Sequence, residues 1–153
     1  MSNTWKWDVR FLELCQVVAS WSKDPSTKTG AVIVRPDFTI ASIGFNGFPR
    51  RCNDAPELYA DRQSKYARIV HCEMNAILSA REPLLGYTLY TWPLASCDRC
   101  AANVIQAGIM RCVAPKASAE KLERWGGNLK IASDLFREAG VTLDLIDVTQ
   151  WKF

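Results

Sequence analysis

Two short motifs bring together residues that could do chemistry. His71, the only histidine of the chain, is followed two positions later by Glu73, and Cys97 and Cys100 lie three positions apart at the start of an expected helix. The two thiols then project from one face of the first turn, where the positive end of the helix dipole favours the thiolate form. One imidazole and two thiolates suit a tetrahedral zinc ion with a fourth position left for water. A glutamate beside such a site can move protons without coordinating the metal.

Each motif has another interpretation when it stands alone. A lone histidine is commonly a core or surface residue, and a lone Cys-x-x-Cys motif also suits redox chemistry. Glu73 could be an exposed carboxylate in a first helical turn. A structural zinc site would be closed by a fourth ligand, and four more cysteines are available: Cys15, Cys52, Cys72 and Cys112. The combination of the two motifs favours a catalytic zinc site over these alternatives.

Length and composition predict the class of protein. With 153 residues, 48% of them apolar and 23% charged, we expect residues 1–153 to form a single domain whose core needs no metal for stability. No apolar run approaches the roughly 20 residues that span a bilayer, and the N-terminus lacks a secretory signal, so we expect a cytoplasmic protein with reduced thiols and no membrane partner. The net charge of +3 is dispersed, which favours a small anionic ligand over nucleic acid.

The elements that must position these motifs follow from apolar periodicity and turn residues. The first half predicts a helix over 7–22 and a hairpin of strands 31–34 and 39–45, followed by a mostly irregular or weakly helical connection over 46–69. The second half predicts alternating elements. These are helices 71–81 and 97–107, strands 87–92 and 110–114, helices 118–125 and 128–139 separated by Gly126 and Gly127, and a last strand in 141–147. Such alternation is typical of an α/β fold with parallel strands.

Several segments resemble a known family. His-Cys-Glu at 71–73 and Cys-Asp-Arg-Cys at 97–100 are similar to the H-x-E…P-C-x-x-C signature of zinc-dependent nucleobase deaminases. SKDPSTKTGAVIV at 22–34, GFNGFPR at 44–50 and VHCEMNAI at 70–77 further resemble the deoxycytidylate deaminase family, and the likeness runs from Trp7 to Gly140. The resemblance implies a three-layer α/β fold of the cytidine-deaminase type, with a central mixed five-stranded sheet flanked by helices.

The resemblance also implies an activity. His71, Cys97 and Cys100 would hold one catalytic Zn²⁺ per subunit, and Glu73 would carry a proton from water to ring N3 during attack on C4. The reaction would convert deoxycytidylate (dCMP) and water to deoxyuridylate (dUMP) and ammonia, and so supply dUMP for thymidylate synthesis. The resemblance further implies a homo-oligomer, with a hexamer as one candidate state, and dCTP or dTTP as effectors.

Substrate contacts are expected from five residues: Asn46, Cys72, Ser96, Lys28 and Tyr66. Asn46 matches an asparagine that contacts the sugar in the family. A phosphate would be bound from a group of basic residues around the expected pocket, namely Lys23, Lys28, Arg50, Arg51, Arg62, Lys65 and Arg68. The group as a whole, rather than any one of these side chains, indicates a nucleotide substrate.

The chain departs from the family at two places beside the expected base. Ser96 replaces the usual proline before Cys97 and follows the small or flexible Leu94 and Ala95. Cys72 occupies a position where alanine is common, and the simplest interpretation is that it is buried as a small apolar side chain. These changes suggest a 5-substituted dCMP as an alternative substrate. Another nucleoside or nucleotide is a second alternative, and a non-catalytic, zinc-containing nucleotide sensor is a third, which Glu73 disfavours because a sensor needs no proton carrier.

Overall fold

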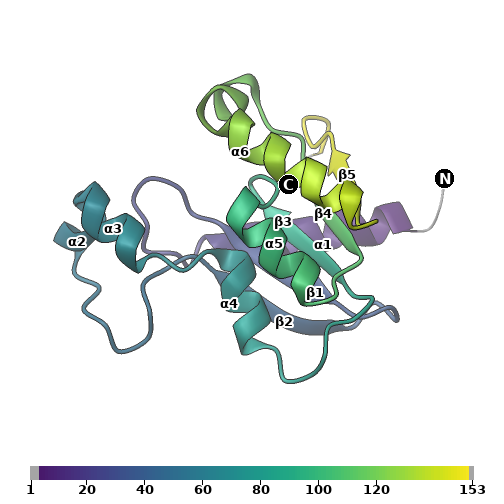
Figure 1. Cartoon of the computed structure of the whole chain (residues 1–153), viewed down its shortest axis with the longest axis horizontal. Coiled ribbons are helices and arrows are strands. Elements are labelled where there is room, and N and C mark those ends of the chain that lie inside the picture. The colour runs from purple at the N-terminus through teal and green to yellow at the C-terminus, as the bar shows by residue number, and fades with distance from the viewer. Residues whose placement is uncertain (1–3, 152–153) are drawn as a thin grey trace.

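A mixed five-stranded sheet forms the centre of the computed structural model, which describes residues 4–151 (Figure 1). The strand order is β2-β1-β3-β4-β5. The strands are β1 (Gly30–Val34), β2 (Ile40–Phe45), β3 (Thr88–Trp92), β4 (Arg111–Pro115) and β5 (Thr142–Ile146). β1 pairs antiparallel with both β2 and β3, whereas β3, β4 and β5 run parallel. The expected mixed five-stranded sheet flanked by helices is confirmed.

Helices cover both faces of the sheet, which makes three layers. Helix α1 (Thr4–Ala19) lies on one face, and α4 (Cys72–Ser79), α5 (Asp98–Gln106) and α6 (Ala119–Glu138) lie on the other (Figure 1). Within β1, Val32 and Val34 pack toward α1, while Ala31 and Ile33 pack toward the other helices. Because both faces are covered, every residue of β1 is buried, as its uninterrupted apolar sequence requires.

The pairing register brings several chain segments to one edge of the sheet. Gly30, at the start of β1, pairs with Phe45 at the end of β2 and with Trp92 at the end of β3. Residues that precede β1 or follow β2 and β3 therefore meet at this edge. Helices α4 and α5 also begin here, because the loops that lead into them come from this side. The motifs predicted to act together thus converge on one edge.

Two predicted helices at the C-terminal end are wrong as separate elements, because α6 is one helix from Ala119 to Glu138 that passes through Gly126 and Gly127. Each glycine in a helix interior lowers helix stability by about 1 kcal/mol relative to alanine. This loss is smaller than the stability gained when the helix continues to residues that pack against the core. Ala132 and Phe136 supply that packing against the core. The helix starts at Ser118, whose hydroxyl accepts a hydrogen bond from the Lys121 amide at 3.3 Å.

Other differences concern the ends of elements. The first helix spans Thr4–Ala19 and not 7–22, and the helices predicted from 71 and 97 begin at Cys72 and Asp98. His71 and Cys97 are the extended residues just before these helices. The connection over 46–69 contains two short helices, α2 (Pro56–Ala60) and α3 (Arg62–Arg68), which extend away from the sheet (Figure 1). None of the helices described between residues 4 and 151 is long and apolar enough to cross a membrane.

Gly44→Ala is expected to destabilise the protein by about 2–3 kcal/mol, within the range for overpacking a core, and to lower Tm by about 5–10 °C. Gly44 lies in β2 directly against α4, and an added Cβ would lie 2.4 Å from the Ala76 nitrogen and 2.5 Å from the Cys72 carbonyl oxygen. Both atoms are backbone, so the helix itself would have to move. Thermal unfolding of the purified variant checks this expectation.

The matched control is Gly127→Ala, because a Cβ at Gly127 would meet nothing within 4 Å. This change should raise stability by about 0.5–1 kcal/mol, since alanine favours a helix interior over glycine. An equal Tm for the two variants would contradict the close contact between β2 and α4.

Candidate metal centre

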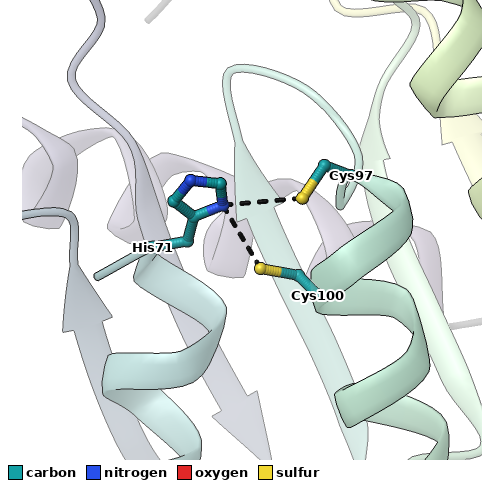
Figure 2. A group of neighbouring side chains, drawn as sticks. All are labelled: His71, Cys97 and Cys100. Carbon is teal, nitrogen blue, oxygen red and sulfur yellow. Dashed lines mark hydrogen bonds between the residues drawn. The ribbon is translucent and has the colours of Figure 1, made fainter. Parts of the chain in front are cut away.

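Three side chains converge where α4 and α5 begin. The Nδ1 atom of His71 lies 3.5 Å from the Cys97 Sγ atom and 3.3 Å from the Cys100 Sγ atom (Figure 2). The three ligand atoms all lie within 4.8 Å of one another. Tetrahedral zinc with bonds of about 2.0–2.1 Å to nitrogen and about 2.3 Å to sulfur places nitrogen and sulfur roughly 3.6 Å apart. The observed spacing and the donor types therefore fit one zinc ion.

Local backbone structure explains this convergence. His71 and Cys97 both have extended conformations, and their carbonyl oxygens accept the first helical hydrogen bonds, from the Asn75 amide at 3.0 Å and from the Ala101 amide at 2.8 Å. Cys100 lies within the first turn of α5 and is buried. Each ligand is thus at or next to a helix N-terminus, where the dipole stabilises negative sulfur.

The two thiols shift each other's pKa in opposite directions. The hydrogen bond from Cys100 lowers the pKa of Cys97 to about 4, with a smaller contribution from His71. The same hydrogen bond, followed by burial, raises the pKa of Cys100, and the contact with Cys97 raises the pKa of His71. A divalent cation would allow both sulfurs to ionise and keep the imidazole neutral, which is the form that ligates zinc.

Glu73 lies buried in the first turn of α4, with 6% of its surface exposed. This burial contradicts the alternative of an exposed helix-terminal carboxylate. The charge of Glu73 contributes to the raised pKa values of His71 and Cys100, so the carboxylate acts on the ligands from close by. A buried carboxylate beside three candidate metal ligands is suited to accept and return protons.

The remaining cysteines do not complete a closed site. Among the residues that the structure describes, the group able to hold a metal ion consists of His71, Cys97 and Cys100 alone. Cys52 is exposed, and the other three are buried without a disulfide: Cys15, Cys72 and Cys112. Burial is the largest cause of the raised pKa of Cys72, which is 1% exposed. A three-ligand centre is therefore favoured over a closed structural site.

Three of the five expected substrate contacts come from the edge that carries the metal ligands. Asn46 follows β2 and is 5% exposed, Cys72 begins α4, and Ser96 directly precedes Cys97. Ser96 is 2% exposed. Its hydroxyl is the one buried side-chain polar atom in residues 4–151 that has no hydrogen-bond partner. An unpaired buried hydroxyl is unfavourable, so a ligand that supplied a partner would gain from it.

The other two expected contacts lie toward solvent. Lys28 is exposed and lines a cavity of about 380 Å³ together with Lys23 and Tyr59. Tyr66 is 64% exposed on α3, with the Arg62 guanidinium 5.9 Å from its ring centre. The structure brings neither side chain into the cluster of His71 and the two cysteines.

Two of the basic residues expected near the phosphate are already paired. Lys23 forms an exposed ion pair of 2.5 Å with Asp54, and Lys65 forms a partly buried one of 2.9 Å with Asp24. Asp24 was not among the residues singled out by the sequence. The Asp-Pro-Ser-Thr turn is the feature that could have indicated it, because an aspartate there accepts backbone hydrogen bonds, here from Ser26 at 2.8 Å and Thr27 at 3.3 Å.

A larger cavity, of about 680 Å³, lies at the opposite end of the sheet between α1 and the ends of β1, β3 and β4. Its charged groups are all in ion pairs: Asp8, Arg111 and Asp144 with one another, and Arg35 with Glu82. Asp8 accepts two hydrogen bonds of 2.9 Å from Arg111 and one of 2.7 Å from the Tyr90 hydroxyl, and Arg111 also binds Asp144. These contacts attach α1 to the sheet.

A family model for the cytidine and deoxycytidylate deaminase zinc-binding region matches residues 5–116. The chain belongs to the cytidine and deoxycytidylate deaminase family. As a member of this family it is an enzyme, a hydrolytic deaminase. Zinc is the cofactor that both the family's zinc-binding region and the cluster of His71, Cys97 and Cys100 fit.

Individual relatives agree with this family. The chain is 40% identical over 136 residues to an uncharacterized deaminase of Aliivibrio fischeri, a match that covers 89% of this chain and 90% of the relative. It is 33% identical to the deoxycytidylate deaminase of Mus musculus, covering 90% of this chain and 78% of the relative. The dCMP deaminase of cyanophage S-TIM5 shares the fold, with a TM-score of 0.72, 17% identity, and 95% and 100% of the two chains covered.

Proposed function

We propose that this enzyme converts dCMP and water to dUMP and ammonia. The observation that carries the proposal is the cluster of His71, Cys97 and Cys100 with the buried carboxylate of Glu73 beside it. The choice of dCMP is supported by the name of the mouse relative and by the cyanophage deaminase of the same fold, which was solved in complex with dCMP and dUMP. The product dUMP would then be available for thymidylate synthesis.

The proposed roles follow from the chemistry of each side chain. His71, Cys97 and Cys100 would hold Zn²⁺, which would supply Lewis-acid activation of the attacking water. Glu73 accepts a proton from the attacking water and donates it to ring N3 as the C4–O bond forms. It then takes the proton of the new C4 hydroxyl and passes it to the amino group, so that the C4–N bond breaks, ammonia leaves and the C4 carbonyl of dUMP remains. Burial of Glu73 limits contact between its carboxylate and bulk water.

The substrate contacts are proposed for the five residues named from the sequence. Asn46 binds the sugar, Cys72 and Ser96 lie beside the base, and the exposed Lys28 and Tyr66 face the phosphate side. The unpartnered hydroxyl of Ser96 supports its part in this proposal.

The wider context of the enzyme is also proposed. We infer that residues 1–153 form one domain and that the enzyme is cytoplasmic. We also infer that it forms a homo-oligomer, with a hexamer as one candidate state, and that dCTP or dTTP acts as an effector. The free state of all six cysteines supports a reducing compartment. The assembly and the effectors rest on the family resemblance.

Ammonia release across a panel of substrates tests the proposed function. The zinc-loaded enzyme should prefer dCMP, with kcat/KM at least tenfold higher than for deoxycytidine, because a bound phosphate adds charge-assisted hydrogen bonds. Cytidylate and 5-methyl-dCMP complete the panel. Equal activity on deoxycytidine would contradict a nucleotide substrate, and a preference for 5-methyl-dCMP would replace plain dCMP by a 5-substituted one.

A further inference from the structure

The amide of Asn46 is held by three partners in one loop. Its Oδ1 atom accepts a hydrogen bond from the Thr29 amide at 2.9 Å. Its Nδ2 atom donates to the Thr27 carbonyl oxygen at 2.9 Å and to the Asp24 carboxylate at 3.3 Å. A backbone amide can only donate, and a carbonyl can only accept, so these partners fix which end of the amide is oxygen.

Asp24 is in turn held by Lys65. The Asp24 side chain is 3% exposed, and its Oδ1 atom accepts a hydrogen bond of 2.9 Å from the ammonium of Lys65, whose side chain is 15% exposed. Lys65 reaches Asp24 from α3, in the connection that leads to His71. A buried carboxylate needs such a partner, because leaving it unpaired is strongly unfavourable. Hydrogen bonds from Lys65 to Asp24 and from Asn46 to Asp24 thus link α3 to the edge of the sheet where His71, Cys97 and Cys100 lie.

The remaining hydrogen-bonding capacity of Asn46 limits what it can bind. Both N–H groups of its amide are used, whereas the carbonyl oxygen has two lone pairs and accepts one hydrogen bond. The side chain of Asn46 can therefore offer a ligand one acceptor and no donor. In dCMP the 5′-oxygen is esterified and the 2′-hydroxyl is absent, so the 3′-hydroxyl is the one hydroxyl donor of the sugar.

We propose that Lys65 is a positioning residue that acts through Asp24 to keep the carbonyl oxygen of Asn46 oriented toward the 3′-hydroxyl of the substrate. The inference rests on the proposed function, because it takes dCMP as substrate and Asn46 as a sugar contact. Lys65 itself touches neither substrate nor metal in this proposal. Its effect is on the orientation of an amide, and so on substrate binding more than on the chemical step.

The experiment compares Lys65→Met with the wild-type enzyme on dCMP and on 2′,3′-dideoxycytidylate, which lacks the 3′-hydroxyl. With dCMP, KM should rise about tenfold, the loss expected for one hydrogen bond, while kcat changes less than about twofold. With the dideoxy substrate, both enzymes should have the same KM, since that contact is missing in both. Lys65→Arg should restore KM for dCMP to within about threefold, because it keeps the charge opposite Asp24.

Two controls separate positioning from general destabilisation. Lys130→Met removes an exposed ion pair of 2.8 Å with Asp134 on α6 and should leave both KM values unchanged. The ratio of kcat/KM for the two substrates, measured on one preparation, does not depend on the fraction of folded enzyme. If Lys65→Met yields no folded protein, Lys65→Gln serves instead, since its amide can still donate to Asp24 without the charge.

The outcomes distinguish this inference from the proposed function. An equal loss on both substrates, or no change on either, would overturn the positioning role of Lys65. Failure of Lys65→Arg to restore KM would also count against it. Absence of wild-type turnover on dCMP would instead refute the proposed substrate, which the wild-type measurement reports separately.

Discussion

Replacing Glu73 by glutamine should lower kcat for dCMP by about 10³-fold or more, because general acid–base catalysis typically contributes about 10²–10⁴-fold and Glu73 is assigned more than one proton transfer. Glutamine has nearly the same shape as glutamate but cannot accept and return a proton at neutral pH. The side chain is buried at the start of α4 and is not proposed as a ligand, so fold and metal should survive. Steady-state ammonia release, zinc content and Tm check the three parts of this expectation.

Two further variants make the result specific to Glu73. Glu120→Gln changes an exposed carboxylate in the first turn of α6 and should retain wild-type kcat. Glu73→Ala should lose as much activity as Glu73→Gln, since the missing property is the proton carrier and not the volume. Activity of Glu73→Gln within tenfold of wild type would show that another group carries the proton.

The convergence of His71, Cys97 and Cys100 could be predicted from the sequence because the geometry of each motif is local. A histidine just before one helix and a Cys-x-x-Cys motif at the start of another each fix their own side chains within a single turn. The sequence also indicated that both helices adjoin strands of one sheet. What it could not supply was the edge at which they meet, since this depends on the pairing of Gly30 with both Phe45 and Trp92.

The errors arose where tertiary packing outweighs local preference. Gly126 and Gly127 predict a break in the chain, yet α6 continues because Ala132 and Phe136 anchor its second half. The partnership of Lys65 with Asp24 spans 41 positions, and neither residue has a periodicity or motif that indicates the other. Contacts between a loop and a distant helix are of this kind, and they include the residues that orient Asn46.

Cys100→Ser should remove zinc and activity together while leaving the protein folded. Loss of one of three ligands is expected to weaken zinc binding by more than about 100-fold, since even residues that only support a ligand contribute about 10–100-fold. The apolar core on both faces of the sheet does not depend on the metal. The Tm of Cys100→Ser should therefore match that of wild-type enzyme treated with a chelator, and both should lie below that of the zinc-loaded enzyme.

Cys52→Ser is the matched control, because it makes the same chemical change at an exposed thiol outside the metal-ligand cluster. Zinc content after gel filtration, measured by atomic spectroscopy, should stay near one per chain in Cys52→Ser and approach zero in Cys100→Ser. Full zinc content in Cys100→Ser would contradict the assigned ligands. If zinc were retained but turnover lost, Cys100 would act in the reaction rather than in metal binding, and a different third ligand would have to be sought. Because the variants differ only in which thiol is replaced, the comparison assigns any loss of zinc to the position of the sulfur and not to the number of cysteines.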